Sequence, residues 1–123
     1  GMDPKVLGIS ISRHTRPKEE EIVEMCGDVF RFLGVSWSEL SPGEISVCYD
    51  YVGAGYGAVT DQALEAIGLA ARLEGLILCH TYAGKALGGL IDLIRRGELT
   101  SRDTVVFVHT GGGVANFAHT ELF

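Results

Sequence analysis

Short apolar runs alternate with longer amphipathic stretches along the 123 residues. Four runs rich in β-branched or other apolar side chains predict strands, over Lys5–Ser12, Ile45–Tyr51, Leu76–Cys79 and Thr104–Val108. Between them, apolar residues recur at three- and four-residue spacing and predict helices over Glu19–Leu33, over Asp61–Glu74 and from about Tyr82 to Arg96. Strands that alternate with helices favour a single α/β domain over residues 1–123. We expect three layers: an open, mostly parallel sheet of about four strands with helices on both faces.

The predicted helices carry their own start and stop signals. Thr60 or Asp61 can cap the second helix and Gly75 can end it. Each helix should bury one apolar face: Ile22, Cys26, Val29, Phe30 and Leu33 in the first, Leu64, Ile67, Ala70 and Ala71 in the second, and Leu87, Leu90, Ile91 and Ile94 in the third. In the third helix, Gly88 and Gly89 favour close packing against the sheet.

Composition excludes several classes of protein. The net charge is -6 and no basic run is present, which argues against nucleic acid as a partner. The longest apolar runs fall far short of the roughly 20 residues of a membrane span. The three cysteines form no Cys-x-x-Cys pair, and the four histidines are not spaced for zinc. These features predict a cytoplasmic protein with reduced thiols, without a metal and away from the membrane.

Three segments that combine glycines with polar residues follow predicted strands, at Tyr56–Gly57, His80–Gly84 and His109–Gly113. In parallel sheets, ligands bind beyond the carboxyl ends of the strands, so these segments predict a small-molecule site. The glycine turn after Thr110, placed at a helix start, can hold a phosphate or carboxylate. A tight turn that only permits close packing is the alternative.

Other candidate groups have structural interpretations. The Gly53-x-Gly55-x-Gly57 spacing differs from that of a dinucleotide-binding loop, and we interpret it as a turn that presents Tyr56. His80 and His109 each follow an apolar run, and we interpret them as structural histidines whose ring nitrogens are hydrogen-bonded. Lys85 falls in the first turn of a predicted helix, where we expect a surface or structural residue rather than a nucleophile.

Four segments together resemble the C-terminal part of D-cysteine desulfhydrases and of the related 1-aminocyclopropane-1-carboxylate deaminases: Asp50–Gly57, Leu64–Gly75, Tyr82–Asp92 and Val108–Gly112. Both groups are pyridoxal-phosphate enzymes of the tryptophan-synthase-β fold type, or fold type II. Tyr-x-Gly-Lys followed by His-Thr-Gly-Gly is the specific part of the likeness. The resemblance covers nearly all of this chain but only roughly the last third of the family's length.

The resemblance implies roles for five residues. Thr110 matches the hydroxyl that hydrogen-bonds the pyridine nitrogen of the cofactor, and Gly111 and Gly112 match the turn that holds this threonine in place. Tyr56 and Tyr82 match two catalytic tyrosines that face the substrate and the cofactor. The implied ligand is a small amino acid.

The sequence also departs from the family pattern. Ala83 stands where deaminases have glutamate and desulfhydrases have threonine, which argues against opening of a cyclopropane ring. Cys79-His80-Thr81 replaces the usual Asp-Pro before the second tyrosine. The backbone conformation that the family has at this point is therefore not implied for this chain. The Schiff-base lysine and the phosphate-binding glycine loop of the family lie upstream of the matched region and have no counterpart here.

We therefore expect a fragment or truncated form of a D-cysteine desulfhydrase-like lyase that is inactive alone. The full enzyme would convert D-cysteine to pyruvate, ammonia and hydrogen sulfide by β-elimination. One alternative is a non-catalytic module that binds a small anion or amino acid. Another is a subunit that completes an enzyme with a separate N-terminal chain. Because a fragment exposes apolar surface, a homo-oligomer is also expected.

Overall fold

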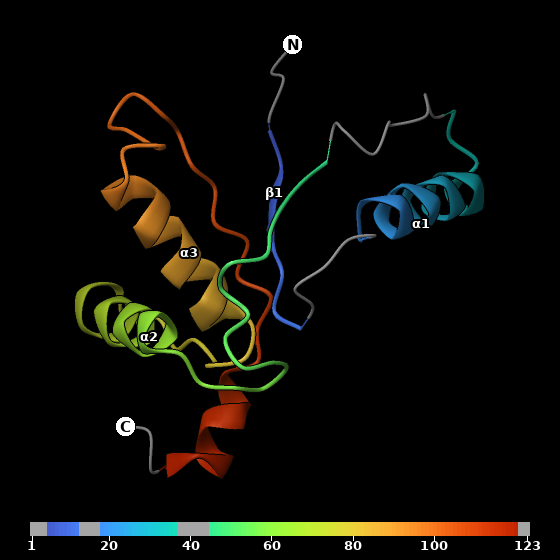
Figure 1. The fold of residues 1–123 in the computed structure, drawn as a ribbon. Helices are drawn as coiled ribbons and strands as arrows, with labels where there is room; N and C mark the ends of the chain where they lie inside the picture. Colours follow the sequence, from blue (N-terminus) through green and yellow to red (C-terminus); the bar gives the residue numbers. More distant parts are fainter. Residues whose placement is uncertain (1–4, 13–17, 37–44, 121–123) are drawn as a thin grey trace.

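The computed structural model describes residues 5–12, 18–36 and 45–120. Along the chain it contains β1 (Leu7–Ile9), α1 (Lys18–Leu33), β2 (Ser46–Cys48), α2 (Asp61–Glu74), α3 (Ala83–Arg95) and a 3₁₀-helix, η2 (Gly113–Ala118). Figure 1 shows α2 and α3 side by side, with α1 set apart from them beyond β1. No described helix is both long and apolar enough to cross a membrane.

The sheet is parallel but smaller than the sequence predicts. β1 pairs with β2 in the register Leu7 to Ser46, Gly8 to Val47 and Ile9 to Cys48. Two of the four expected strands therefore form, in shortened versions of Lys5–Ser12 and Ile45–Tyr51. In the described part of the chain, the expected three layers with helices on both faces of a four-stranded sheet do not form.

The other two expected strands run outside any described sheet, for two different reasons. In the segment 76–79, three successive carbonyl oxygens already have partners. The Ile77 oxygen contacts His109 Nε2 at 3.2 Å, and the Leu78 oxygen accepts a hydrogen bond from Asn116 Nδ2. The Cys79 oxygen accepts from Gly84 N. The segment 104–108 finds no partner strand among the described residues, and Val106 remains 83% exposed. Strand formation needs a neighbouring backbone, which local sequence does not specify.

α2 has the predicted bounds because its end signals are local. Thr60 Oγ1 accepts a hydrogen bond from Ala63 N at 3.2 Å, and Gly75 ends the helix in the left-handed conformation, φ 67°. Its buried face differs from the predicted one: Ala63, Ala66, Ile67 and Ala70 are buried, whereas Leu64 is half-buried and Ala71 is exposed. The small alanines allow α3 to approach closely.

The predicted face of α3 is confirmed in part: Leu87 packs against the core and Leu90 and Ile91 are half-buried, whereas Ile94 is exposed. The buried positions of α3 are Ala83, Gly84, Lys85, Gly88, Gly89 and Leu93. A Cβ on Gly88 would lie 2.9 Å from the Gln62 carbonyl oxygen of α2, and one on Gly89 would lie 3.0 Å from the Tyr51 ring. The close packing predicted for this glycine pair is confirmed, although Gly88 packs on a helix.

Polar contacts fix α3 to its neighbours. Tyr51 Oη donates to Asp92 Oδ2 at 2.7 Å, which ties the residues after β2 to the middle of the helix. Arg95 makes two hydrogen bonds to the Glu65 carboxylate of α2, at 2.8 and 2.6 Å. α2, α3 and the chain after β2 therefore form a connected unit.

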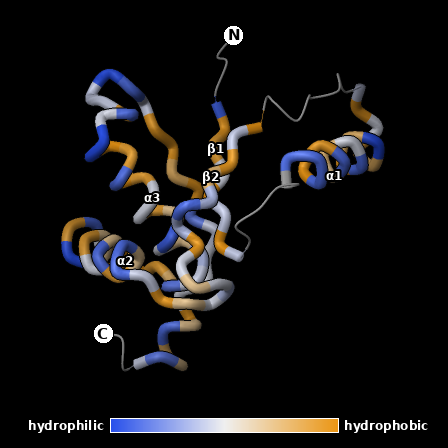
Figure 2. Tube along the Cα trace, viewed as in Figure 1, coloured by the Kyte–Doolittle hydropathy of each residue, from blue (hydrophilic) through white to orange (hydrophobic). Residues whose placement is uncertain are grey.

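α1 begins one residue before the predicted helix and ends at the predicted residue, yet its apolar face is not covered as predicted. Val29 and Leu33 are exposed, and Ile22, Cys26 and Phe30 are only half-buried. A link to the rest of the chain is the hydrogen bond of 2.9 Å from Tyr49 Oη to Glu19 Oε2. Figure 2 shows hydrophobic positions on α1 and along the segment 104–108. The described residues therefore cover the apolar face of α1 only in part.

Candidate active site

Two tyrosines that lie 26 residues apart in sequence meet at their hydroxyl groups. Tyr56 Oη and Tyr82 Oη form a short hydrogen bond, and the rings lie edge to face with centroids 6.1 Å apart. Tyr56 comes from the glycine-rich turn after β2, and Tyr82 is the residue before the first turn of α3. Both rings are partly exposed, so the paired hydroxyls are accessible to a ligand.

The turn that carries Tyr56 depends on glycine. Gly53, Gly55 and Gly57 all have positive φ angles, of 70°, 148° and 75°. A Cβ on Gly53 would also lie 2.5 Å from Thr60 Cγ2. The alternating glycines therefore permit a backbone conformation that directs Tyr56 toward Tyr82. The sequence predicts such a turn, one that presents Tyr56.

A buried lysine holds the same turn. Lys85 Nζ donates to the carbonyl oxygens of Val52 at 2.7 Å and Gly55 at 3.2 Å. The side chain is 1% exposed, and burial lowers the pKa of its ammonium group. Lys85 is thus a structural residue, as one of our expectations had it, and not a surface residue. Its position on the buried face, three residues after Tyr82, is the signal that could have revealed this.

The third predicted segment lies against Tyr82. Gly112 has φ 88°, and a Cβ there would lie 2.7 Å from Cys79 Sγ and 3.7 Å from Tyr82 Cδ2. Cys79 Sγ also accepts a hydrogen bond of 3.3 Å from Tyr82 N. Only glycine lets the turn after Thr110 reach this position, so Gly112 acts through close packing as well as through its backbone conformation.

Thr110 is exposed at this turn, and its neighbour Gly111, at φ 93°, has no other atom within 4 Å of an added Cβ. His109 fixes the turn from its other side. Gly111 N donates to His109 Nδ1 at 2.9 Å, so the ring proton lies on Nε2, which faces the Ile77 carbonyl oxygen at 3.2 Å. His109 therefore behaves as the structural histidine that the sequence predicts.

The contact between the tyrosines affects the ionisation of Tyr82. The hydrogen bond to Tyr56 is the largest cause that raises the pKa of Tyr82 above its ordinary value, and desolvation is the second. A phenol with a raised pKa keeps its proton at neutral pH. The pair can therefore donate a proton or hold a polar group of a ligand.

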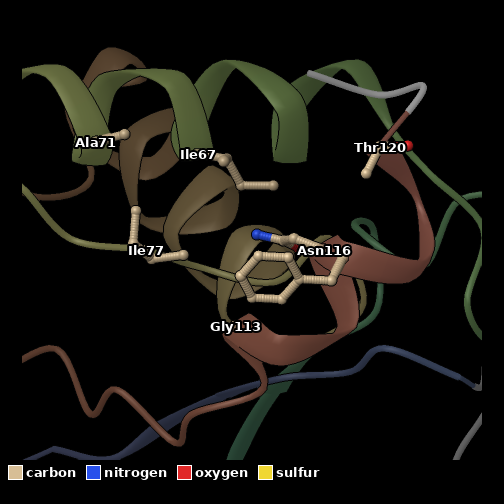
Figure 3. A pocket seen from close by; sticks show the side chains of 7 residues that line it. Ile67, Ala71, Ile77, Gly113, Asn116 and Thr120 are labelled. Atoms are coloured by element: carbon tan, nitrogen blue, oxygen red, sulfur yellow. The ribbon is translucent and has the colours of Figure 1, made fainter.

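An apolar groove of about 460 Å³ lies apart from these tyrosines, between α2 and η2. Figure 3 shows Ile67 and Ala71 of α2 facing Ile77 and Asn116 across it. Its other lining residues are Gly113, Phe117 and Thr120. Sequence analysis did not identify this groove, because it assigned Ile67 and Ala71 to a buried helix face. The segment after Gly112 was expected to start a helix; it forms the 3₁₀-helix η2.

Known proteins share this arrangement of segments. The chain is 33% identical over 115 residues to a D-cysteine desulfhydrase of Yersinia enterocolitica, which covers 94% of this chain and 34% of the relative. A crystal structure described as an ACC deaminase homologue superposes with a TM-score of 0.72 at 30% identity, again over 94% of this chain and 34% of the other. The chain thus spans about a third of the length of these relatives.

The family profile described as pyridoxal-phosphate dependent enzyme matches residues 6–111. The match extends from β1 through both tyrosine segments and Thr110 to Gly111. It therefore includes the two strands, α2, α3 and most of the candidate site. On this evidence the chain belongs to the family of pyridoxal-phosphate dependent enzymes.

Proposed function

We propose that this chain forms the substrate-facing wall of a pyridoxal-phosphate dependent lyase that acts on D-cysteine. The observation that carries the proposal is the hydroxyl contact between Tyr56 and Tyr82, with Gly112 packed beside Tyr82. Three segments that resemble the desulfhydrases thereby come together at one place. The overall reaction would convert D-cysteine and water to pyruvate, ammonia and hydrogen sulfide.

The residues of the turn after His109 fit one end of the cofactor. Thr110 is an exposed hydroxyl beside the open space at Gly111, which suits a hydrogen bond to an aromatic ring nitrogen. Pyridoxal phosphate, when bound, supplies an electron sink for the electron pair released at the substrate Cα. A neutral threonine hydroxyl would leave the ring nitrogen largely unprotonated, which suits elimination.

The tyrosine pair would donate a proton to the leaving group. Tyr82 carries its phenolic proton at neutral pH, as any phenol does, and the hydrogen bond to Tyr56 raises its pKa further. It can therefore donate that proton to the departing sulfur, while Tyr56 orients the donor. Both hydroxyls are open to water in this chain, and we propose that the remainder of a complete enzyme covers them.

The covalent lysine of the cofactor site would come from outside these 123 residues. Lys85, which lies beside the tyrosine turn, is fully buried and donates to two backbone carbonyls. An amine that attacks a carbonyl carbon needs a free lone pair and access to it. The geometry of Lys85 supports a structural role instead.

The proposal predicts opposite results for the chain alone and for a chimera. With pyridoxal phosphate and D-cysteine, the purified chain should release no sulfide above the level of free cofactor. A chimera in which this chain replaces the matching third of the Yersinia desulfhydrase should release sulfide and pyruvate. Sulfide release is measured by colorimetry, and pyruvate by coupling to lactate dehydrogenase.

Two outcomes would contradict this account. One is a folded chimera that binds the cofactor yet leaves D-cysteine unchanged. The other is activity of the chain alone that disappears in Lys85→Met. Borohydride reduction and peptide mass spectrometry then show whether Lys85 carries the cofactor.

We further propose that the chain on its own self-associates through the exposed segment 104–108. Val106 and Val108 are 83% and 72% exposed, and the backbone around them lies outside any described sheet. Exposed apolar extended segments pair with other chains. We expect light scattering at micromolar concentration to give at least twice the 13.2 kDa of one chain.

Charge placed on that segment should reverse the association. The double variant Val106→Lys, Val108→Lys should shift the mass toward that of a single chain. Leu73→Lys is the matched control, because Leu73 is as exposed as Val108 but lies on α2. A monomeric parent chain would contradict the proposal, as would an unchanged mass in the double variant.

A further inference from the structure

Lys85 is a buried cation whose partners in the described part of the chain are two backbone carbonyls, those of Val52 and Gly55. Among the described residues it is the largest of the fully buried side chains, ahead of Leu78, Val52 and Cys79. Burial lowers the pKa of its ammonium group, and no described carboxylate offsets this effect. A buried cation is commonly less favourable for stability than an apolar side chain of similar volume. A methionine here would fill the space without that cost.

The ammonium group spans the glycine turn. Its two acceptors, the carbonyls of Val52 and Gly55, stand on either side of Gly53 and Ala54, and Gly55 immediately precedes Tyr56. Positive φ angles at Gly53, Gly55 and Gly57 leave this turn with wide conformational freedom. The two hydrogen bonds select one path through the turn.

The same side chain starts from the helix that carries the second tyrosine. Lys85 follows Tyr82 by three residues, and Gly84 N is anchored by the Cys79 carbonyl oxygen at 2.8 Å. The base of Lys85 is therefore fixed to the frame of Tyr82, and its tip is fixed to the frame of Tyr56. One side chain thus links the two segments whose hydroxyl groups meet.

We propose that Lys85 is a positioning residue: its ammonium group holds the 52–56 turn so that the Tyr56 hydroxyl contacts that of Tyr82. The role rests on the proposed function, in which this pair faces the substrate. It is nevertheless a property of the chain itself. It can be measured without cofactor or substrate.

The test is a spectrophotometric titration of phenolate in the 123-residue chain. The ionisation of Tyr82 is obtained as the difference between each protein and the same protein carrying Tyr82→Phe. Tyr51, whose pKa burial and the hydrogen bond to Asp92 raise to about 12, is present in both proteins of each pair, so its ionisation cancels in the difference. Circular dichroism and urea unfolding establish that each variant is folded.

Lys85→Met should lower the pKa of Tyr82 toward its ordinary value, because the contact that raises it is lost. Tyr56→Phe should have the same effect. Combining the two should lower the pKa no further, since both remove one contact. Lys85→Gln, which keeps an N–H donor without the charge, should restore part of the shift.

Val52→Ala serves as the control for general loosening. It removes a fully buried side chain from the same turn but keeps the carbonyl that Lys85 contacts. It should lower stability and leave the ionisation of Tyr82 unchanged. The proposal is overturned if folded Lys85→Met ionises like the parent, or if Val52→Ala shifts Tyr82 as much as Lys85→Met does.

If Lys85→Met does not fold, Lys85→Leu, which also lacks a donor, decides the question with and without Tyr56→Phe by the same comparison. An unchanged Tyr82 ionisation in folded Lys85→Leu, together with an undiminished effect of Tyr56→Phe, would then overturn the proposal. Because the titration contains no cofactor, its outcome is independent of sulfide release by the chimera. Failure of the positioning role and failure of the proposed function are thus distinguishable.

Discussion

Gly84→Ala should lower the free energy of unfolding by about 1–3 kcal/mol, the usual range for overpacking a tight contact. The added Cβ would lie 2.7 Å from the Cys79 carbonyl oxygen and 3.0 Å from the Ile67 side chain. Gly84 cannot move away freely, because its N–H donates to that same carbonyl. This loss of stability has the opposite sign to the helix preference of alanine, which is favoured over glycine in a helix by about 1 kcal/mol. Urea unfolding followed by circular dichroism measures the change.

Gly68→Ala provides the matched control within the same pair of helices. Gly68 lies in α2, and an added Cβ would meet only Arg72 Nη2 at 4.0 Å. With space available, the helix preference of alanine should act alone and stabilise the protein by up to about 1 kcal/mol. If Gly84→Ala stabilises the chain as Gly68→Ala does, the close packing of α3 on α2 and Cys79 is wrong.

Tyr82→Phe in the desulfhydrase chimera should reduce kcat by about 10²–10⁴-fold, the usual contribution of a positioned proton donor. The phenyl ring keeps the packing against Gly112 but removes the proton that Tyr82 would donate to sulfur. KM for D-cysteine should change less than kcat, because the lost interaction matters most in the transition state. Initial rates of sulfide release over a range of D-cysteine concentrations give both constants.

Tyr49→Phe is the control for this experiment. It likewise removes a phenolic hydroxyl, but from a tyrosine that donates a hydrogen bond to Glu19 at the start of α1 and does not belong to the pair. Its kcat should stay close to that of the parent chimera. Equal kcat values for Tyr82→Phe and the parent would exclude a proton-donating role for Tyr82.

Local signals in the sequence predicted the helices well. The Thr60 cap and the Gly75 terminator act within a few residues of α2, so its bounds follow from the chain alone. The strands depend on partners. The run 104–108 has the composition of a strand, but no described strand lies beside it. The carbonyls of Ile77 and Leu78 meet the distant side chains of His109 and Asn116. Hydrophobic pattern cannot supply a missing neighbour.

The faces of α2 and α3 were predicted only in part, for a different reason. Ile67 and Ala70 of α2 are buried as predicted, and Leu87 of α3 packs against the core. The periodicity missed the small residues of the contact, such as Ala66 and Gly88. Small residues bring helix backbones together, and hydrophobicity alone does not rank them as core. A structural role was one of two expectations for Lys85, but its full burial was not predicted, because lysines usually face water.

The candidate site was predictable in part. The order of the glycine segments suggested that Tyr56, Tyr82 and the turn after Thr110 lie at one edge. The structure brings Tyr56 to Tyr82 and packs Gly112 beside Tyr82. The contacts that produce this arrangement, from Lys85 to the 52–56 turn and from Gly112 to Cys79, join residues 30 or more positions apart. The catalytic roles of the tyrosines and the cofactor contact of Thr110 remain predictions.

The central claim is that this chain supplies the substrate-facing wall of a D-cysteine lyase. The rate of sulfide release from D-cysteine by the chimera with the Yersinia desulfhydrase tests it most directly. The account predicts release that requires both the added pyridoxal-phosphate site and the Tyr82 hydroxyl. A folded, cofactor-loaded chimera that releases no sulfide would contradict the account.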